Sequence, residues 1–485
     1  MNNRKLASFQ GQIETVLQLS LADLDLRVRR LFKVLRIKSH LTSAEIKKWD
    51  GYAPVHLMFV LVNLVFLHVG SVHDLTKRFA ATFYKAQKDT FYRFKNSEWG
   101  WRPFYWRFIR HLGTRLNWSK TVKENYFIID TSVLAKRGKK MEHVSFVYDH
   151  SQKKTVNGYE LVSLGLLTPT NFYPLDFSYR FSNRRYQEAK DATVLKPTGA
   201  LAKRIREAQS LSKPELAVKM LKQALAKGIP ASYLLIDSWF SSPKLFKNVL
   251  ELQLHVIGRL KNTKTLYRYD NQRLRLSKLY EVIKDSLVKD PELGCLLNSV
   301  PVLCGNGVEG TIVFVKGYKE PELDGTQGRK KTPEPKWAAF FSTDPKLSGR
   351  EVVKKYILRW SIEVFFKEAK QRLGLGKEQS RSFAAQIFSV TQSFVRYSML
   401  AYLLEQEPSQ STIGDMFHQI EQEAGAVSFF ERLWDYFCLF LRRCLDTLAQ
   451  FFNLGPEFRD YIGAICSAAN AFEPLKGCET LVDNN

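Results

Sequence analysis

The sequence contains few cysteines and no arrangement of them that is typical of a zinc site. There is no CxxC pair, and no histidines stand at zinc-ligand spacing from any cysteine. We therefore expect reduced, mostly buried thiols, as in a cytosolic protein. The six cysteines are Cys295, Cys304, Cys438, Cys444, Cys466 and Cys478.

Long hydrophobic runs are also missing. The most apolar stretch, residues 56–69, is too short to cross a bilayer and contains Asn63 in its middle. It is more typical of a buried helix. The opening residues MNNRKLASFQGQ are polar and do not resemble a secretory signal. Internal repeats and long low-complexity tracts are absent as well. We expect a cytoplasmic protein without membrane segments.

Acidic residues are scarce relative to basic ones. The chain has 73 Lys and Arg against 48 Asp and Glu, a formal net charge of +25. Such an excess indicates a polyanionic partner, because cations that neutralise phosphates release condensed counterions. An anionic membrane surface or a ribosome would attract the same charge.

Residues 1–118 have apolar residues at helical spacing and few strand signals. Thr42 and Glu45 form a capping-box pattern, which predicts that a helix begins there. The run EWGWRPFYWRFIRH (98–111) interleaves basic and aromatic residues, a composition that suits DNA contact. Aromatic side chains that fill the core of a helical domain would give the same pattern.

Residues 119–261 change to an α/β texture. Three consecutive strands are followed by a helical stretch and a strand that ends on Asp237, which is the order of an RNase H-like mixed sheet. The predicted strands are 126–134, 144–149, 160–168, 172–179, 232–237 and 254–260.

Residues 262–346 form a predicted β-rich insertion that interrupts this core. The core resumes over 347–380, where Ser348 and Glu351 form a capping box that opens a long amphipathic helix. Residues 381–485 are helical again. Their aromatic-rich stretch, 428–452, suits either a core or a contact between two copies of the chain.

Two aspartates stand at predicted strand ends, Asp130 after FII and Asp237 after LLI. A lone aspartate of this kind is usually a turn or cap residue. In an RNase H-like sheet, however, the first and fourth strands are neighbours, so both carboxylates reach one site. Oxygen ligands of this kind suit Mg²⁺ or Mn²⁺.

The capped helix supplies a third carboxylate. Tyr356, Arg359, Glu363 and Lys370 fall within roughly 60° of one another on a helix of 3.6 residues per turn. A solvated stripe of ion pairs is the common origin of such a pattern. One carboxylate between two cations is also what a metal ligand beside bound phosphates needs. Other carboxylates lie close in sequence, so spacing alone does not fix the set: Glu368, Asp149 and Asp176.

The Y-x2-R-x3-E-x6-K spacing resembles the signature of the insertion-sequence-four family of bacterial DDE transposases, the YREK group. The resemblance covers about residues 125–375, includes the β-rich insertion, and implies that Asp130, Asp237 and Glu363 are the catalytic, metal-holding residues. It further implies cut-and-paste transposition: two Mg²⁺ or Mn²⁺ ions, cleavage at insertion-sequence ends, and strand transfer, with a hairpin intermediate in some members.

The same resemblance implies the DNA-contacting residues. Tyr356, Arg359 and Lys370 would hold phosphates, and a tryptophan would stack on a base flipped out beside the cut. Trp337 stands at the comparable place in the insertion. Trp239 and Trp360 are alternative candidates for this stacking tryptophan. Arg259 and Lys261 are expected to hold further backbone phosphates.

The expected partners are double-stranded DNA and a second copy of the chain, because two element ends must be synapsed. The expected location is the cytoplasm, at the bacterial nucleoid. Two alternatives remain: another RNase H-like nuclease, and a non-catalytic DNA-binding protein derived from a transposase. The intact carboxylates argue against the second, and the Tyr–Arg–Lys stripe would be unexplained by the first.

Overall fold

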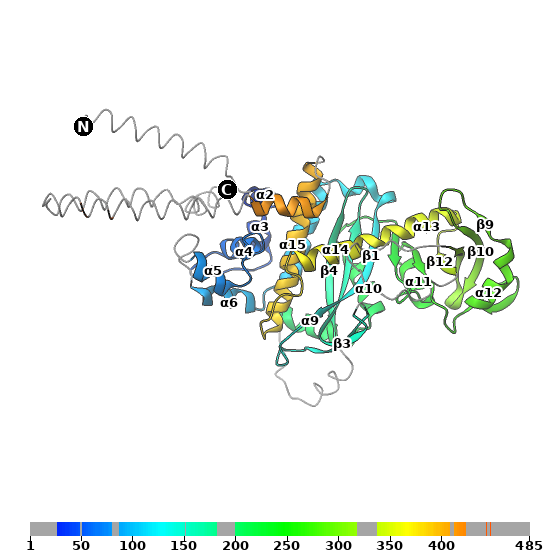
Figure 1. Ribbon diagram of the computed structural model, residues 1–485, viewed down its shortest axis with the longest axis horizontal. Helices are drawn as coiled ribbons and strands as arrows, with labels where there is room; N and C mark the ends of the chain where they lie inside the picture. Colours follow the sequence, from blue (N-terminus) through cyan, green and yellow to red (C-terminus); the bar gives the residue numbers. More distant parts are fainter. Residues whose placement is uncertain are drawn as a thin grey trace. The chain divides into compact units, whose positions relative to one another are not determined.

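The chain divides into two compact units, residues 1–97 with 409–485 and residues 98–408 (Figure 1). Each is described by itself. The computed structural model describes residues 27–48, 51–79, 87–150, 152–181, 199–317, 337–407 and 412–422, together with 443 and 447. Most of the aromatic stretch 428–452 lies outside these residues, so its predicted role in dimerisation stays a prediction.

Short helices build the first unit, as the sequence predicted for this region. They are α2 (Arg27–Val34), α3 (Ile37–Ser43), α4 (Pro54–Asn63), α5 (Val72–Phe79) and α6 (Lys88–Asn96). The apolar stretch 56–69 contains most of α4, whose side chains are largely buried, as expected. The predicted helix start at Thr42 is wrong: α3 ends at Ser43, and Glu45 has a left-handed backbone with φ of 60°.

No helix in the described part of the chain is both long and apolar enough to cross a membrane.

A mixed sheet forms the centre of the second unit. Its first strands are β1 (Tyr126–Ala135), β2 (Ser145–Asp149), β3 (Lys154–Leu167), β4 (Phe172–Arg180), β5 (Tyr233–Ile236) and β6 (His255–Arg259). β3 runs antiparallel to β1, β2 and β4, whereas β5 is parallel to β1 and β6 is parallel to β5. The order β4-β3-β1-β5-β6 places the first strand beside the crossover strand, as predicted.

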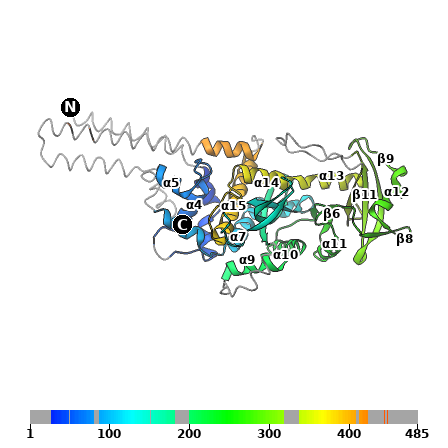
Figure 2. The same cartoon turned by 60° about the horizontal axis from the view of Figure 1, so that its bottom comes forward.

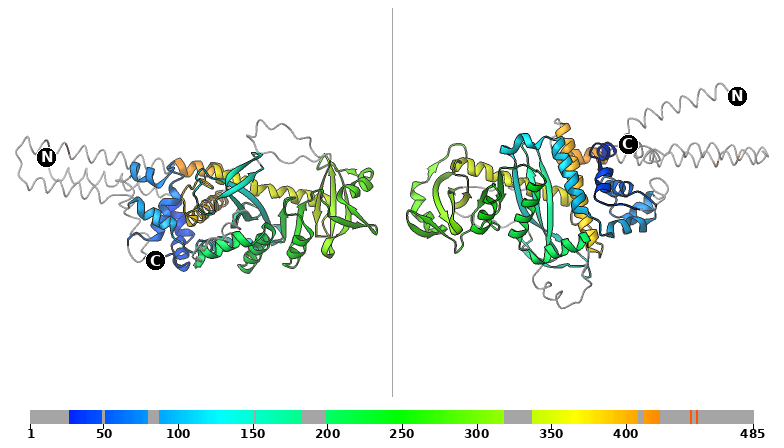
Figure 3. Two further views of the ribbon diagram at one scale, coloured as in Figure 1. Left: turned by 90° about the horizontal axis from the view of Figure 1, so that it is seen from below. Right: turned by 180° about the vertical axis from the view of Figure 1, so that it is seen from behind.

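The β-rich segment after β6 extends this sheet. Its elements are β7 (Leu266–Tyr269), β8 (Gln272–Arg275), α12 (Leu276–Ile283), β9 (Val288–Lys289), β10 (Leu296–Cys304), β11 (Val308–Lys316) and β12 (Trp337–Ser342). β12 pairs antiparallel with β6, so the twelve-stranded sheet continues from the first strands into the segment (Figure 3). Backbone hydrogen bonds at the edge of β6 therefore tie the segment to the strand next to β5.

Helices cover both faces of the sheet (Figure 2). One face carries α9 (Gly199–Ser210), α10 (Lys213–Ala226) and α11 (Pro243–Leu250), and the other carries α13 (Gly349–Ile357), α14 (Ser361–Gln371) and α15 (Phe383–Gln406). The predicted capping box opens α13, because the Ser348 backbone N–H donates to Glu351 Oε2 at 2.8 Å. Helix α7 (Trp101–Arg115) packs on β4 and α15, and Tyr105 donates to the Pro174 carbonyl.

A buried ion cluster joins α7, α9 and β4. The guanidinium of Arg102 donates to both oxygens of Glu207 at 2.8 and 2.9 Å, and to Asp176 Oδ1 at 2.8 Å. The side chains of Asp176 and Glu207 are 3% and 2% exposed, so their charges depend on these partners. Arg204 lies in the same cluster and donates to the Phe177 carbonyl at 2.6 Å.

Glu207→Ala should lower the free energy of unfolding by about 3–5 kcal/mol, because it removes one of the two carboxylates that compensate the buried guanidinium groups. Denaturant unfolding of the two proteins measures the change. Glu251→Ala, a similar truncation at an exposed position of the same unit, should change stability by less than about 0.5 kcal/mol. Equal effects of the two substitutions would contradict a structural role for the cluster.

Candidate active site

Asp130 and Asp237 lie side by side on neighbouring parallel strands. The β1–β5 register pairs Ile129 with Ile236; Asp130 is the next residue of β1, and Asp237 is the first residue after β5. Both strands enter the site as buried apolar runs, which explains why the carboxylates stand at the edge of a hydrophobic core. The prediction that Asp130 ends its strand is wrong, because antiparallel pairing with β3 extends β1 to Ala135. The neighbouring strand β5 does end at Ile236, so Asp237 beside Asp130 lies outside the strand.

Glu363 joins this pair through Arg359. The guanidinium donates to Asp130 Oδ2 at 3.2 Å and to Glu363 Oε1 at 2.5 Å. The side chains of Arg359, Asp130 and Glu363 are 9%, 15% and 28% exposed, so these contacts are shielded from bulk water. The arginine therefore holds two carboxylates from elements more than 200 residues apart in sequence.

Burial and mutual repulsion both favour the protonated acids. Burial raises the pKa of Asp130 to about 7; Arg359 opposes the shift, and the charges of Asp237 and Glu363 add to it. Burial also raises the pKa of Asp237, against the backbone N–H groups of Phe240 and Trp239 that donate to its Oδ1 at 3.2 and 3.1 Å. A cluster of acids that repel one another in this way is stabilised by a cation.

The donor set suits a hard divalent cation, since carboxylate oxygens are the ligands that Mg²⁺ and Mn²⁺ take. Among the residues that the structure describes, no three His, Cys, Asp or Glu side chains are gathered closely enough to hold a metal. The guanidinium of Arg359 lies between Asp130 and Glu363 instead. The positive charge of Arg359 thus compensates the acids, and a metal shared by Asp130 and Glu363 requires this side chain to move.

The predicted single helix through Tyr356 and Lys370 is interrupted. A short 3-10 turn, Leu358–Trp360, separates α13 from α14. Tyr356 is 3% exposed and its ring packs on Phe340 at 4.6 Å. Lys370 is half-buried, and burial lowers its pKa while the nearby charge of Asp149 acts in the opposite direction.

Within the four-residue stripe, Arg359 bonds directly to Asp130, and Glu363 is connected to that aspartate through Arg359.

The two predicted phosphate contacts after β5 lie at the same edge of the sheet. Ile129 of β1, Ile236 of β5 and Gly258 of β6 are at the same level across the three parallel strands. The residues that follow them, Asp130, Asp237 and Arg259, are therefore neighbours. Lys261 follows β6 and is exposed.

The three tryptophans differ in how much of the indole is free. Trp337 is half-buried and stacks on Tyr280, with ring centroids 4.4 Å apart and planes 14° apart. Trp360 is half-buried as well. Trp239 is 51% exposed and lies two residues from Asp237. The ammonium of Lys213 sits 4.0 Å from the Trp239 ring centroid.

Lys213 had no role in the sequence analysis. It opens α10, its positive charge lowers the pKa of Asp237 against the larger effect of burial, and it pairs with Glu160. Lys213 lies between Ser212 and Glu215, the capping box of α10, and that pattern does not indicate that Lys213 lies close to Trp239 and Asp237. The rival carboxylates have other partners: Asp176 belongs to the buried ion cluster and Glu368 pairs with Arg372 at 2.5 Å.

Two protein-family models match the chain. Residues 69–278 match a DDE superfamily endonuclease model, and residues 201–394 match a transposase DDE domain model. The matches support a DDE transposase family and a nuclease-type enzyme. No curated protein matches the sequence.

Six chains of solved structures match this chain. One belongs to the Drosophila P element transposase strand transfer complex, with 11% identity over 56% of this chain and 55% of that chain. Its TM-score is 0.23, too low to support an argument, and this chain spans about half of that chain's length.

The raised pKa of Asp130 predicts a pH-dependent stability of the metal-free protein. The folded state binds its proton up to about pH 7, whereas an unfolded aspartate releases it near pH 4. Stability should therefore fall as pH rises from about 4 to 7 and level off above, by at most about 4 kcal/mol.

Asp130→Asn should remove most of this slope and stabilise the protein at pH 8, as measured by chemical denaturation in EDTA. Asp285→Asn makes the same chemical change at an exposed site and should preserve the slope. A wild-type profile that is flat between pH 4 and 8 would show that Asp130 titrates normally.

Proposed function

We propose that this chain is a cut-and-paste DDE transposase with an RNase H-like core, in which Asp130, Asp237 and Glu363 are the catalytic and metal-holding carboxylates. The observation that carries the proposal is the convergence of these residues. Two aspartates occupy adjacent positions on parallel strands, and Arg359 connects one of them to the glutamate. The matches to DDE endonuclease and transposase models support it, as does the Y-x2-R-x3-E-x6-K spacing of the YREK group.

Mg²⁺ or Mn²⁺ bound by these carboxylates would activate the attacking oxygen and stabilise the leaving one. The protein's own contribution is to hold the ligands on two strands and a helix. Arg359, once it leaves Asp130 and Glu363, can donate two parallel hydrogen bonds to a phosphate of the substrate. Lys370, Arg259 and Lys261 add cations, and Tyr356 supports Arg359 through its ring, 5.7 Å from the guanidinium carbon.

The proposed ligand is duplex DNA, first the element ends and then the target. A net charge of +25 favours it, and we assign end recognition mainly to residues 1–118. Synapsis of two ends calls for a homodimer, and the bacterial nucleoid is the matching location. The alternatives stay distinguishable: a non-catalytic relative binds ends without cutting, and another RNase H-like nuclease cuts without strand transfer.

Asp130→Ala, Asp237→Ala and Glu363→Ala should each reduce cleavage of an end-containing duplex by at least about 1000-fold while DNA binding changes little. The reason is that metal chemistry needs every ligand, whereas binding depends on phosphate contacts. Gel assays of nicking and of mobility measure the two effects. Wild-type cleavage should require Mg²⁺ or Mn²⁺.

Glu368→Ala is the matched control, because Glu368 lies on α14 beside Glu363 but pairs with Arg372. It should retain cleavage. Activity of Glu363→Ala, or undiminished cleavage in EDTA, would remove Glu363 and the metal from the proposal.

A tryptophan that stacks on an extruded base contributes about 1–3 kcal/mol. Trp337 stays a proposed DNA contact, but Tyr280 covers one of its faces, and exposure favours Trp239 for stacking. Trp239→Ala should keep the melting temperature and first-strand nicking but slow the later steps about 10-fold or more. Trp337→Ala should lower the melting temperature and slow every step together. The reverse pattern would assign stacking to Trp337.

A further inference from the structure

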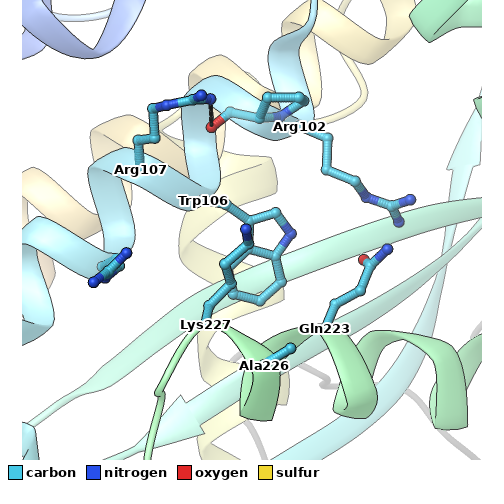
Figure 4. A pocket seen from close by; sticks show the side chains of 8 residues that line it. Arg102, Trp106, Arg107, Gln223, Ala226 and Lys227 are labelled. Carbon is cyan, nitrogen blue, oxygen red and sulfur yellow. Dashed lines mark hydrogen bonds between the residues drawn. The ribbon is translucent and has the colours of Figure 1, made fainter. Parts of the chain in front are cut away.

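A cavity of about 640 Å³ lies between α7 and α10, outside the carboxylate site (Figure 4). The side chains that shape it are Arg102, Trp106, Arg107, Arg110, Gln223 and Lys227. Arg102, Trp106 and Arg110 recur every four residues and therefore share one side of α7, with Arg107 next to them. The indole of Trp106 stands in the middle of the group, with Gln223 of α10 and Lys227, which follows that helix, on the facing side.

No aspartate or glutamate lines the cavity, whose inner surface is mostly apolar, and its charged groups are the cations Arg102, Arg107, Arg110 and Lys227. The charge of Arg102 is already matched by Glu207 and Asp176. The surplus comes from Arg107, Arg110 and Lys227, all of which are exposed. A concave surface with uncompensated cations concentrates anions.

Trp106 supplies a hydrogen-bond donor at the same place. The residue is 5% exposed, and its Nε1 has no acceptor among the residues that the structure describes. A buried N–H without a partner costs about 1–3 kcal/mol, which an acceptor oxygen would recover. An indole N–H only donates, so its ligand must present an acceptor, as a phosphate oxygen does.

We propose that this cavity binds a backbone phosphate of duplex DNA. The assignment rests on the proposed function for its choice of DNA among phosphate ligands. The cavity also has a definite position relative to the active site. Helix α10 begins at Lys213, which lies over Trp239 beside Asp237, and it ends just before Lys227. At 1.5 Å per residue the helix is about 20 Å long, so the phosphate lies several base pairs away from the cut.

The test measures duplex DNA binding against salt concentration, without divalent metal, so that no cleavage is involved. Lys227→Gln and Arg107→Gln should each lower the slope of log Kobs against log[salt] by about 0.9, the value for one lost phosphate contact. Trp106→Phe keeps an aromatic ring and removes the N–H. It should weaken binding about 5-fold or more at every salt concentration.

Lys222→Gln is the matched control, since Lys222 is exposed on α10 but does not line the cavity. It should leave the slope unchanged. Melting temperatures verify that each variant folds. A slope that Lys227→Gln and Lys222→Gln change equally would overturn the site.

A second experiment distinguishes a backbone phosphate of DNA from a free phosphate as the ligand of this cavity. If inorganic phosphate or a nucleoside triphosphate raises the melting temperature of the wild type but not of Trp106→Phe, while the DNA slope is unchanged in every variant, the cavity serves a free phosphate and the DNA assignment is wrong. Failure of the proposed function looks different: wild-type protein then binds duplex DNA but does not cut it, and Asp130→Ala is indistinguishable from wild type.

Discussion

The parallel pairing of β1 with β5 is the constraint on which the rest of the site depends. It sets Asp130 and Asp237 at adjacent positions although more than 100 residues separate them in sequence. Parallel strands require a crossover connection, and α9 and α10 belong to it. The β6 strand continues the parallel arrangement and adds Arg259 to the same edge. A sheet with another strand order would leave these side chains on separate edges.

Bringing acids together inside the protein has an electrostatic cost, and Arg359 reduces it in the metal-free state. The 3-10 turn at Leu358–Trp360 places this residue between α13 and α14. There its guanidinium reaches Asp130 and Glu363 at once. The resulting ion pairs compensate the carboxylates, but they also occupy the space between them. Any cation that uses both carboxylates competes with this guanidinium, so metal affinity and the position of Arg359 are linked.

The buried ion cluster has a comparable effect where α7 and α9 meet β4. Arg102 donates to Glu207 and to Asp176 Oδ1, and these ion pairs, together with Arg204, connect α7 to α9 and β4. Arg102 is engaged in this cluster, whereas Arg107 and Arg110 on the same helix are exposed. The basic character of this chain is thus divided between charges that stabilise the fold and charges that face solvent. Only the solvent-facing group can attract a polyanion.

The sequence by itself determined the basic charge and much of the order of the elements, and it predicted the three acids. Apolar runs that end at Asp130 and Asp237, and the Ser348–Glu351 capping box, depend on local hydrophobicity and hydrogen bonding, which single segments express. It also indicated a β-rich segment after β6. Two predictions from local patterns were wrong because contacts with other segments set the ends of the elements. A helix ends near Thr42 instead of beginning there, and β1 continues past Asp130 because β3 pairs with it.

Only the tertiary structure decided which side chains meet. Tyr356, Arg359, Glu363 and Lys370 share a spacing, yet the 3-10 turn and packing against Phe340 bury Tyr356. Lys213 beside Trp239, Trp337 on Tyr280, and the cavity between α7 and α10 join segments far apart in the chain. Contacts of this kind follow from the packing of whole elements. A sequence records the residues that an element offers, whereas the three-dimensional arrangement selects their partners.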